Sequence, residues 1–138
     1  MTLNVEQKLE IHELLSRAAY AFDVQDMTLL EACFAKEAEF SMRIADGDTI
    51  GPFVGRPAVM KLFTDSIAVQ TDVRRHVISN IFFESKDDPI EVISNLTLIA
   101  TENGEIALLT AALYRDTVIF EDDEWRLHKR FIQLDKSY

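Results

Sequence analysis

The segment RRHVISN, residues 74–80, places His76 directly before an apolar run, Ile81 to Phe83. An imidazole gains and loses a proton near neutral pH, which suits it to general acid–base chemistry. Two interpretations are open: His76 packs as a half-polar core residue, or its strand lines a wet cavity where an imidazole is useful. The two arginines that precede it, Arg74 and Arg75, are expected to form the wet rim of the strand.

Other residues with chemical potential form no known motif. The remaining histidines, His12 and His128, lie on separate predicted elements without metal-ligand spacing, so we expect no bound metal. The single cysteine, Cys33, excludes an intrachain disulfide, and its apolar helical surroundings predict a buried, inert thiol. The four glycines form no dinucleotide-binding or phosphate-binding loop, and there is no G-x-S-x-G segment. We therefore expect no cofactor.

A second cluster of cationic residues occurs near the end of the chain, where Arg126, His128 and Arg130 alternate along a predicted strand. Alternate residues of a strand share one face of the sheet. This pattern predicts a solvated stripe, balanced by carboxylates on the neighbouring strand, rather than a phosphate site. Trp125, in the same strand, is predicted to fill the core or a dimer contact.

The spacing of apolar residues predicts three helices, over 5–22, 27–34 and 57–69. Asn4 and Gln7 have the spacing of a capping box at the start of the first helix. The start of the second is ambiguous between caps at Asp26 and Thr28. Pro57 suits the first position of the third helix, because its missing N–H has no helical partner there.

Alternating and continuous apolar patterns predict six strands, over 39–43, 50–54, 73–85, 90–102, 105–120 and 124–134. The segment ADGD (45–48) predicts a turn in which Gly47 adopts a positive φ. The turn signals KDDP, ENGE and EDDE connect the last four strands into an antiparallel meander. Antiparallel strands of this length must coil, so we expect a sheet strongly curved around the helices.

This order of elements predicts an α+β fold with the helices on one face of the sheet. In 77–83 both alternating sets are mostly apolar, with Ile78 and Phe82 on one side and Val77, Ile81 and Phe83 on the other. Helices cover only one face of such a sheet, so a second apolar face predicts a homodimer formed sheet to sheet. The alternative is a few singly exposed aliphatic residues.

Several segments resemble the SnoaL-like group of the nuclear transport factor 2-like superfamily. The segment YAFDVQDMTLLEACFAKEAEF (20–40) is similar to that group's helical start, RRHVISN to its central His-x-x-x-Asn strand, and GRPAVMKLF (55–63) to its third helix. Residues 114–135 resemble its last hairpin, including that of ring-hydroxylating dioxygenase small subunits. The resemblance implies one domain over 1–138: a cone-shaped α+β barrel of cystatin-like fold, with N-terminal helices packed in the concave face of a mainly antiparallel sheet.

The resemblance also implies that Asp23 and His76 point into the central cavity, where a carboxylate beside an imidazole would form a general base. The chain is similar to scytalone dehydratase at these two positions. It departs from that enzyme at Phe22, where the enzyme has a tyrosine, and near Ala111, where it has a second histidine. The residues expected to contact a ligand are Tyr20, Phe22, Phe40, Ile78, Asn80 and Tyr114.

Two functions are consistent with this resemblance. One is a cofactor-free lyase or isomerase acting on a small apolar, oxygenated molecule; the other is a non-catalytic ligand-binding protein or structural subunit. Asp23 could instead bond backbone amides, and His76 could be a core histidine. A contact between them within about 3.2 Å, open to a pocket of roughly 300 Å³ or more, would favour ligand chemistry.

The composition restricts the partners. The formal net charge of −10 argues against binding nucleic acid or an anionic membrane, because both require clustered cations. No apolar run approaches the roughly 20 residues of a membrane helix. The N-terminal segment lacks the features of a signal peptide, so a cytoplasmic protein is expected.

Overall fold

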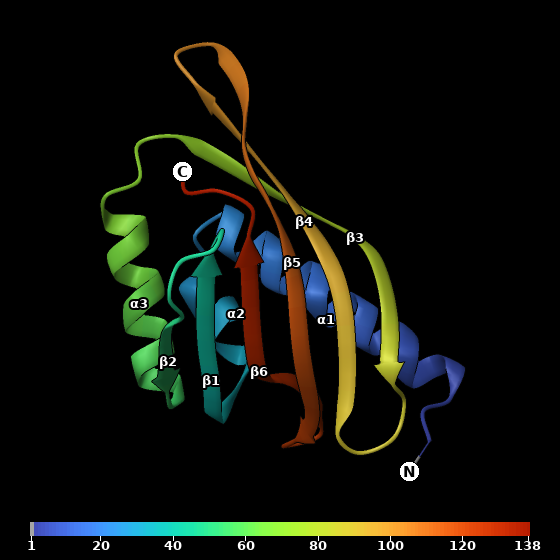
Figure 1. Cartoon of the computed structure of the whole chain (residues 1–138). Helices are drawn as coiled ribbons and strands as arrows, with labels where there is room; N and C mark the ends of the chain where they lie inside the picture. The colour runs from blue at the N-terminus through green and yellow to red at the C-terminus, as the bar shows by residue number, and fades with distance from the viewer. Residues whose placement is uncertain (1) are drawn as a thin grey trace.

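The structure, a computed structural model, describes residues 2–138. Three helices and six strands make up the fold (Figure 1). In chain order they are α1 (Val5–Asp23), α2 (Met27–Ala32), β1 (Phe34–Ile44), β2 (Ile50–Val54), α3 (Arg56–Ala68), β3 (Val73–Ser85), β4 (Ile90–Glu102), β5 (Glu105–Glu121) and β6 (Glu124–Leu134).

The six strands form one curved, open sheet in the order β2-β1-β6-β5-β4-β3. Strands β3 to β6 are the predicted antiparallel meander, and β1 joins it by pairing parallel to β6. Helix α1 packs against β3 and β6, and α3 packs against β1 and β2 (Figure 1). The helices thus cover one face of the sheet, as predicted for the α+β, cystatin-like fold. The core lies between the two layers.

The helix ends follow the local sequence. Asn4 and Gln7 form the predicted capping box of α1, and Asp26 rather than Thr28 caps α2, its side chain accepting from the Leu29 N–H. The second helix is shorter than predicted, because Phe34 already belongs to β1. That strand is correspondingly longer than the expected 39–43.

Two turn predictions require correction. Helix α3 begins at Arg56, so Pro57 is its second residue rather than its first. In the turn between β1 and β2, the positive φ falls on Ala45 (48°) and not on Gly47. Arg43 donates a hydrogen bond from Nε to the carbonyl of Gly47, which fixes the turn from the other side.

Two β-bulges change which side chains face the helices. The pairing of β3 with β4 shifts by one residue between Ser79 and Phe82, where Asn80 adopts a positive φ of 54°. Ile78, Ile81 and Phe83 therefore all pack against the core, while Phe82 is exposed. The predicted grouping of Ile78 with Phe82 on one face is wrong, because the extra residue reverses the alternation.

The second bulge lies in β6, where the pairing with β5 shifts between Leu127 and Lys129. Leu127 faces the core before the bulge, and Arg130 and Ile132 face it afterwards. The predicted pairing with carboxylates of the neighbouring strand is correct for both arginines, since Arg126 pairs with Glu121 at 3.7 Å and Arg130 with Asp116 at 2.8 Å. The predicted solvation is wrong for both, because their side chains are only 13% and 9% exposed.

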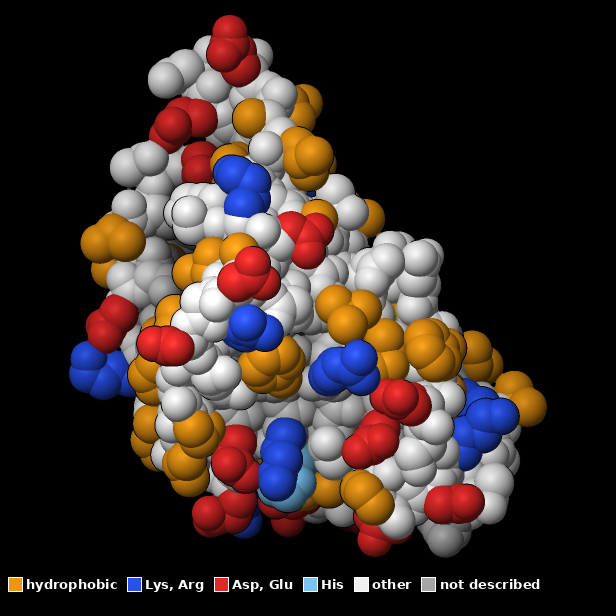
Figure 2. Space-filling model, viewed as in Figure 1, with side chains coloured by type: hydrophobic (Ala, Val, Ile, Leu, Met, Phe, Trp, Pro, Cys, Tyr) orange, Lys and Arg blue, Asp and Glu red, His pale blue; other side chains and the backbone are white. Residues whose placement is uncertain are grey.

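The outer face of the sheet carries a mixture of apolar and charged side chains (Figure 2). Val77 and Phe82 are exposed on β3, and Ile106 and Leu108 are exposed on the hairpin between β4 and β5. That hairpin projects beyond the rest of the sheet (Figure 1). The homodimer stays a prediction that these residues motivate. Among residues 2–138, no helix combines the length and apolar character needed to span a membrane.

Candidate functional site

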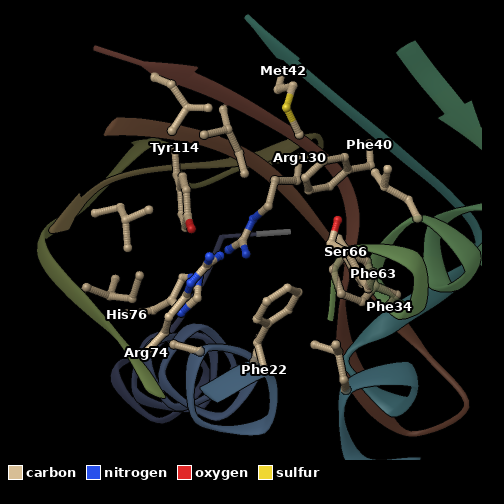
Figure 3. A pocket seen from close by; sticks show the side chains of 18 of the residues that line it. Phe22, Phe34, Phe40, Met42, Phe63, Ser66, Arg74, His76, Tyr114 and Arg130 are labelled. Carbon is tan, nitrogen blue, oxygen red and sulfur yellow. The ribbon is translucent and has the colours of Figure 1, made fainter. Parts of the chain in front are cut away.

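A cavity of about 110 Å³ lies between the inner face of the sheet and the three helices (Figure 3). Its wall is mostly apolar and includes Phe22, Phe34, Phe40, Met42, Phe63 and Ile78. Phe63 is the centre of an aromatic cluster, with the rings of Phe22, Phe34 and Phe40 each within 5.4 Å of it, centroid to centroid. The cavity is smaller than the roughly 300 Å³ expected for a drug-sized ligand, and its volume suits a single ring.

His76 lines this cavity, and Asp23 holds it in place from the end of α1. The Nδ1 atom of His76 lies 2.5 Å from Oδ1 of Asp23. The backbone N–H of His76 also donates to both carboxylate oxygens, each at 3.0 Å. An ionised carboxylate only accepts hydrogen bonds, so Nδ1 is the protonated ring nitrogen. The other nitrogen, Nε2, has no hydrogen-bond partner among residues 2–138 and carries a free lone pair.

The pair is largely shielded from solvent. The side chains of Asp23 and His76 are 9% and 12% exposed, respectively. The Phe22 ring meets the imidazole edge to face at 5.1 Å between centroids. The ring of His76 is thus fixed on one side by a carboxylate and on another by an aromatic face, which pre-orients Nε2.

Arg130 enters the cavity wall from β6, where the bulge turns it inward. Its Nε and Nη2 donate to the two oxygens of Asp116, at 2.8 and 3.0 Å. Burial acts to lower the pKa of Arg130, but the Asp116 carboxylate outweighs it and the pKa is raised overall. The guanidinium also lies over the Tyr114 ring, 4.3 Å from its centroid.

Tyr114 is buried and lines the same cavity. Burial raises the pKa of its phenol well above the ordinary range, and the Arg130 cation offsets only part of that effect. The phenol is therefore a neutral hydrogen-bond donor at any physiological pH. No described residue hydrogen-bonds its hydroxyl, which points into the cavity (Figure 3).

Arg74 lies on β3 two residues before His76 and also lines the cavity. Its Nε donates to Asp72 at 2.8 Å, and its guanidinium lies over the Tyr138 ring, 5.2 Å from the centroid. The prediction that both arginines form a solvent-exposed rim is correct for Arg75, which is exposed, and wrong for Arg74, which is half-buried in the cavity wall.

The expected ligand-contact residues divide into two groups. Phe22, Phe40, Ile78 and Tyr114 line the cavity. Tyr20 and Asn80 do not: Tyr20 is 59% exposed on α1, and Asn80 is exposed at the β3 bulge, which turns it away from the face of His76.

Arg130 was missed as a cavity residue, although the sequence contains a signal for it. Trp125 and Leu127 are apolar on one face of a regular strand, whereas the apolar pair Ile132 and Leu134 would lie on the other face. An intervening bulge is required, and it reverses the face of every residue beyond it.

A family model described as the SnoaL-like domain matches residues 4–131, so the chain belongs to the SnoaL-like family. A comparison with curated proteins gave no match. Within residues 2–138, no group of three histidine, cysteine, aspartate or glutamate side chains is placed to hold a metal ion.

Solved structures confirm the cystatin-like fold. A protein of unknown function from Nostoc punctiforme matches with a TM-score of 0.81 and 24% identity, covering 98% of this chain and 96% of that one. A scytalone dehydratase-like protein from Novosphingobium aromaticivorans matches with a TM-score of 0.76 and 23% identity, over 95% and 85%. The beta subunit of benzoate 1,2-dioxygenase from Burkholderia mallei matches with a TM-score of 0.80 and 17% identity, over 98% and 93%.

Proposed function

We propose that this protein catalyses proton transfer on a small, ring-sized oxygenated molecule, with Nε2 of His76 as the general base and Asp23 as its positioning partner. The observation that carries the proposal is the 2.5 Å contact between Nδ1 and the Asp23 carboxylate, which leaves Nε2 unpartnered at a cavity wall. A base within an apolar cavity and held in one tautomer is suited to abstracting a proton from carbon.

The chemistry follows from the position of the free lone pair. Nε2 takes a proton from the carbon next to a substrate carbonyl, and the C–H electron pair forms a C=C bond while the carbonyl electrons move to oxygen. Where the enolate is conjugated with a neighbouring C=C bond, the imidazolium returns the proton to the far carbon of that bond, the C=C bond moves, the carbonyl is restored, and an isomerisation is complete. Alternatively, the enolate expels a hydroxide from the next carbon, and the imidazolium protonates it to water, which completes a dehydration. Asp23 stabilises the imidazolium in both cases.

Dehydration of the kind catalysed by scytalone dehydratase is less well supported than isomerisation. The chain has Phe22 and Ala111 at two of the positions where that enzyme carries polar residues, and neither supplies a proton. Tyr114 is the available phenol on the cavity wall.

The second candidate is a non-catalytic ligand-binding protein or structural subunit. The small volume of the cavity, about 110 Å³, favours it, as does the similarity of fold to a dioxygenase beta subunit. In that case His76 would orient a bound molecule without accepting its proton.

Deuterium exchange separates the two candidates. A thermal-shift screen of small cyclic ketones and hydroxyketones first selects molecules that stabilise the protein. NMR then measures deuterium incorporation next to the carbonyl of each selected molecule in D₂O. We expect His76→Gln to slow exchange by roughly 10²–10⁴-fold. Asp23→Asn should also slow it, because a neutral amide cannot stabilise the imidazolium.

The control is His128→Gln, which removes a histidine outside the cavity and should leave exchange unchanged. Ligand binding without any exchange above the His76→Gln background would refute catalysis and establish the second candidate.

A further inference from the structure

The polar side chains of the cavity wall are Ser66, Arg74, His76, Tyr114, Arg130 and Tyr138, and no aspartate or glutamate of residues 2–138 contributes to it. Apart from Nε2 of His76, which carries a lone pair, these side chains can all donate hydrogen bonds. The chain as a whole has 24 acidic and 14 basic residues, so a wall with two guanidinium groups and no carboxylate departs strongly from the composition.

Both arginines keep donors free for a ligand. Asp116 occupies Nε and Nη2 of Arg130, and Nη1 has no hydrogen-bond partner among the described residues. Asp72 occupies only Nε of Arg74, which leaves both of its terminal nitrogens without a described partner on the cavity side. Figure 3 shows the guanidinium groups of Arg74 and Arg130 directed into the same cavity as the Tyr114 hydroxyl.

The location of Arg130 is not explained by stability. Its side chain is 9% exposed and that of Asp116 is fully buried. A buried ion pair offers little net stabilisation over an apolar pair of similar volume, because both charges must lose their hydration. The cavity wall around Arg130 is largely aromatic, and an aliphatic side chain could fill the position of Arg130. The guanidinium at this wall still has one donor nitrogen, Nη1, that is available to a ligand.

We propose that the cavity binds a small ring carboxylate, with its two oxygens accepting hydrogen bonds from Arg130 Nη1, Arg74 and the Tyr114 hydroxyl, and its ring packed among Phe22, Phe40 and Phe63. The inference deepens the proposed function, on which it rests, by naming the class of substrate. A planar carboxylate matches converging guanidinium donors, and charge-assisted hydrogen bonds at a shielded site are stronger than neutral ones.

The arrangement also sets the position of the reacting carbon. Arg74 and His76 point to the same side of β3, two residues apart. Neighbouring residues on one strand face are about 7 Å apart along the strand. A carboxylate at Arg74 thus places the atoms of a single attached ring within reach of Nε2.

Isothermal titration calorimetry with matched carboxylates and amides tests the proposal. Acetate, cyclopentanecarboxylate and benzoate are each compared with the corresponding neutral amide, at low and high salt. We expect at least one ring carboxylate to bind roughly tenfold or more tightly than its amide, with the difference shrinking in high salt. The proposal is overturned if every carboxylate binds no better than its amide, or if none binds.

Three variants locate the binding. Arg74→Gln should weaken carboxylate binding by roughly tenfold, and Arg130→Lys should weaken it while retaining a cation beside Asp116 and hence the fold. The matched control is Arg75→Gln, which removes the same charge from the exposed face of the same strand and should change nothing. Equal losses for Arg74→Gln and Arg75→Gln would show that only the overall charge matters, and would refute the site.

His76→Gln separates this inference from the proposed function. It should abolish deuterium exchange yet retain carboxylate binding within a few-fold. Carboxylate binding that depends on Arg74, without proton transfer, would refute the catalytic role and leave the anion site standing. Proton transfer on neutral ketones, with no preference for carboxylates, would refute the anion site and leave the catalytic role of His76 standing.

Discussion

Removing one partner of the Asp116–Arg130 pair should destabilise the protein far more than removing both. The two side chains are 0% and 9% exposed and share two hydrogen bonds, of 2.8 and 3.0 Å. Asp116→Leu leaves a buried guanidinium with no countercharge, and Arg130→Met leaves a buried carboxylate. Each single change should cost about 3–5 kcal/mol of unfolding free energy. For a chain of this length, that corresponds to a fall in Tm of roughly 10–20 °C.

The double variant Asp116→Leu/Arg130→Met buries no unpaired charge. It should therefore be less destabilised than either single variant and remain within about 1–2 kcal/mol of the wild type. Urea unfolding of the four proteins in a double-mutant cycle gives the coupling energy, which these losses put at about 4 kcal/mol or more. The control is Arg115→Met on the same strand, because Arg115 and Glu84 form an exposed pair whose loss should cost less than about 1 kcal/mol.

A double variant that loses as much stability as the two single variants added together would contradict this prediction. Additivity would mean that the two charges do not interact, and that solvent rather than the partner compensates each of them. The bidentate geometry would then have no energetic counterpart.

Three further predictions concern other parts of the molecule. Burial raises the pKa of Tyr114, so the unfolded chain releases this proton at a lower pH than the folded protein does. The free energy of unfolding should therefore fall as pH rises above the ordinary tyrosine range. Ultraviolet titration should show one tyrosine that ionises only when the protein unfolds, and Tyr114→Phe should remove that signal. Burial also raises the pKa of the fully buried Cys33 thiol, so a disulfide reagent should react with it only as fast as the protein opens; rapid reaction in the native state would contradict this burial. If the outer sheet face forms a homodimer, light scattering should report a dimer that Phe82→Glu converts to monomer. Val69→Glu, at the exposed C-cap of α3, should leave the dimer intact. A wild-type monomer at micromolar concentration would show the prediction to be wrong.

Much of this fold is readable from sequence because its strands are long and their turns are explicit. The segments ENGE and EDDE place Asn103, Asp122 and Asp123 at positive φ, where short polar residues are tolerated and hairpins turn tightly. Apolar periodicity over ten or more residues then predicts the ends of the four long strands to within a residue or two. Phe34 was assigned to the wrong element because a single aromatic residue after a short helix carries no periodicity of its own.

The candidate site was only partly predictable, for a different reason. The pairing of Asp23 with His76 joins residues 53 positions apart and was suggested by the resemblance to a family, not by spacing. Asn80 and Arg130 were placed on the wrong faces because alternation was extended through a bulge in each strand. A bulge changes one backbone position but inverts every later side chain, so a local irregularity produces a large error in assigning the cavity wall.

The bulge in β6 also poses a problem of register for the folding chain. If it formed beyond Arg130 instead of near His128, Lys129 and Phe131 would face inward and Arg130 would face out. Phe131 is apolar, so hydrophobic burial alone would discriminate poorly between these two pairings. Asp116 provides the discrimination, because the competing register would leave its carboxylate buried without a cation. A charge pair that contributes little net stability would thus favour one register of β6 against β5, the register in which the cavity exists.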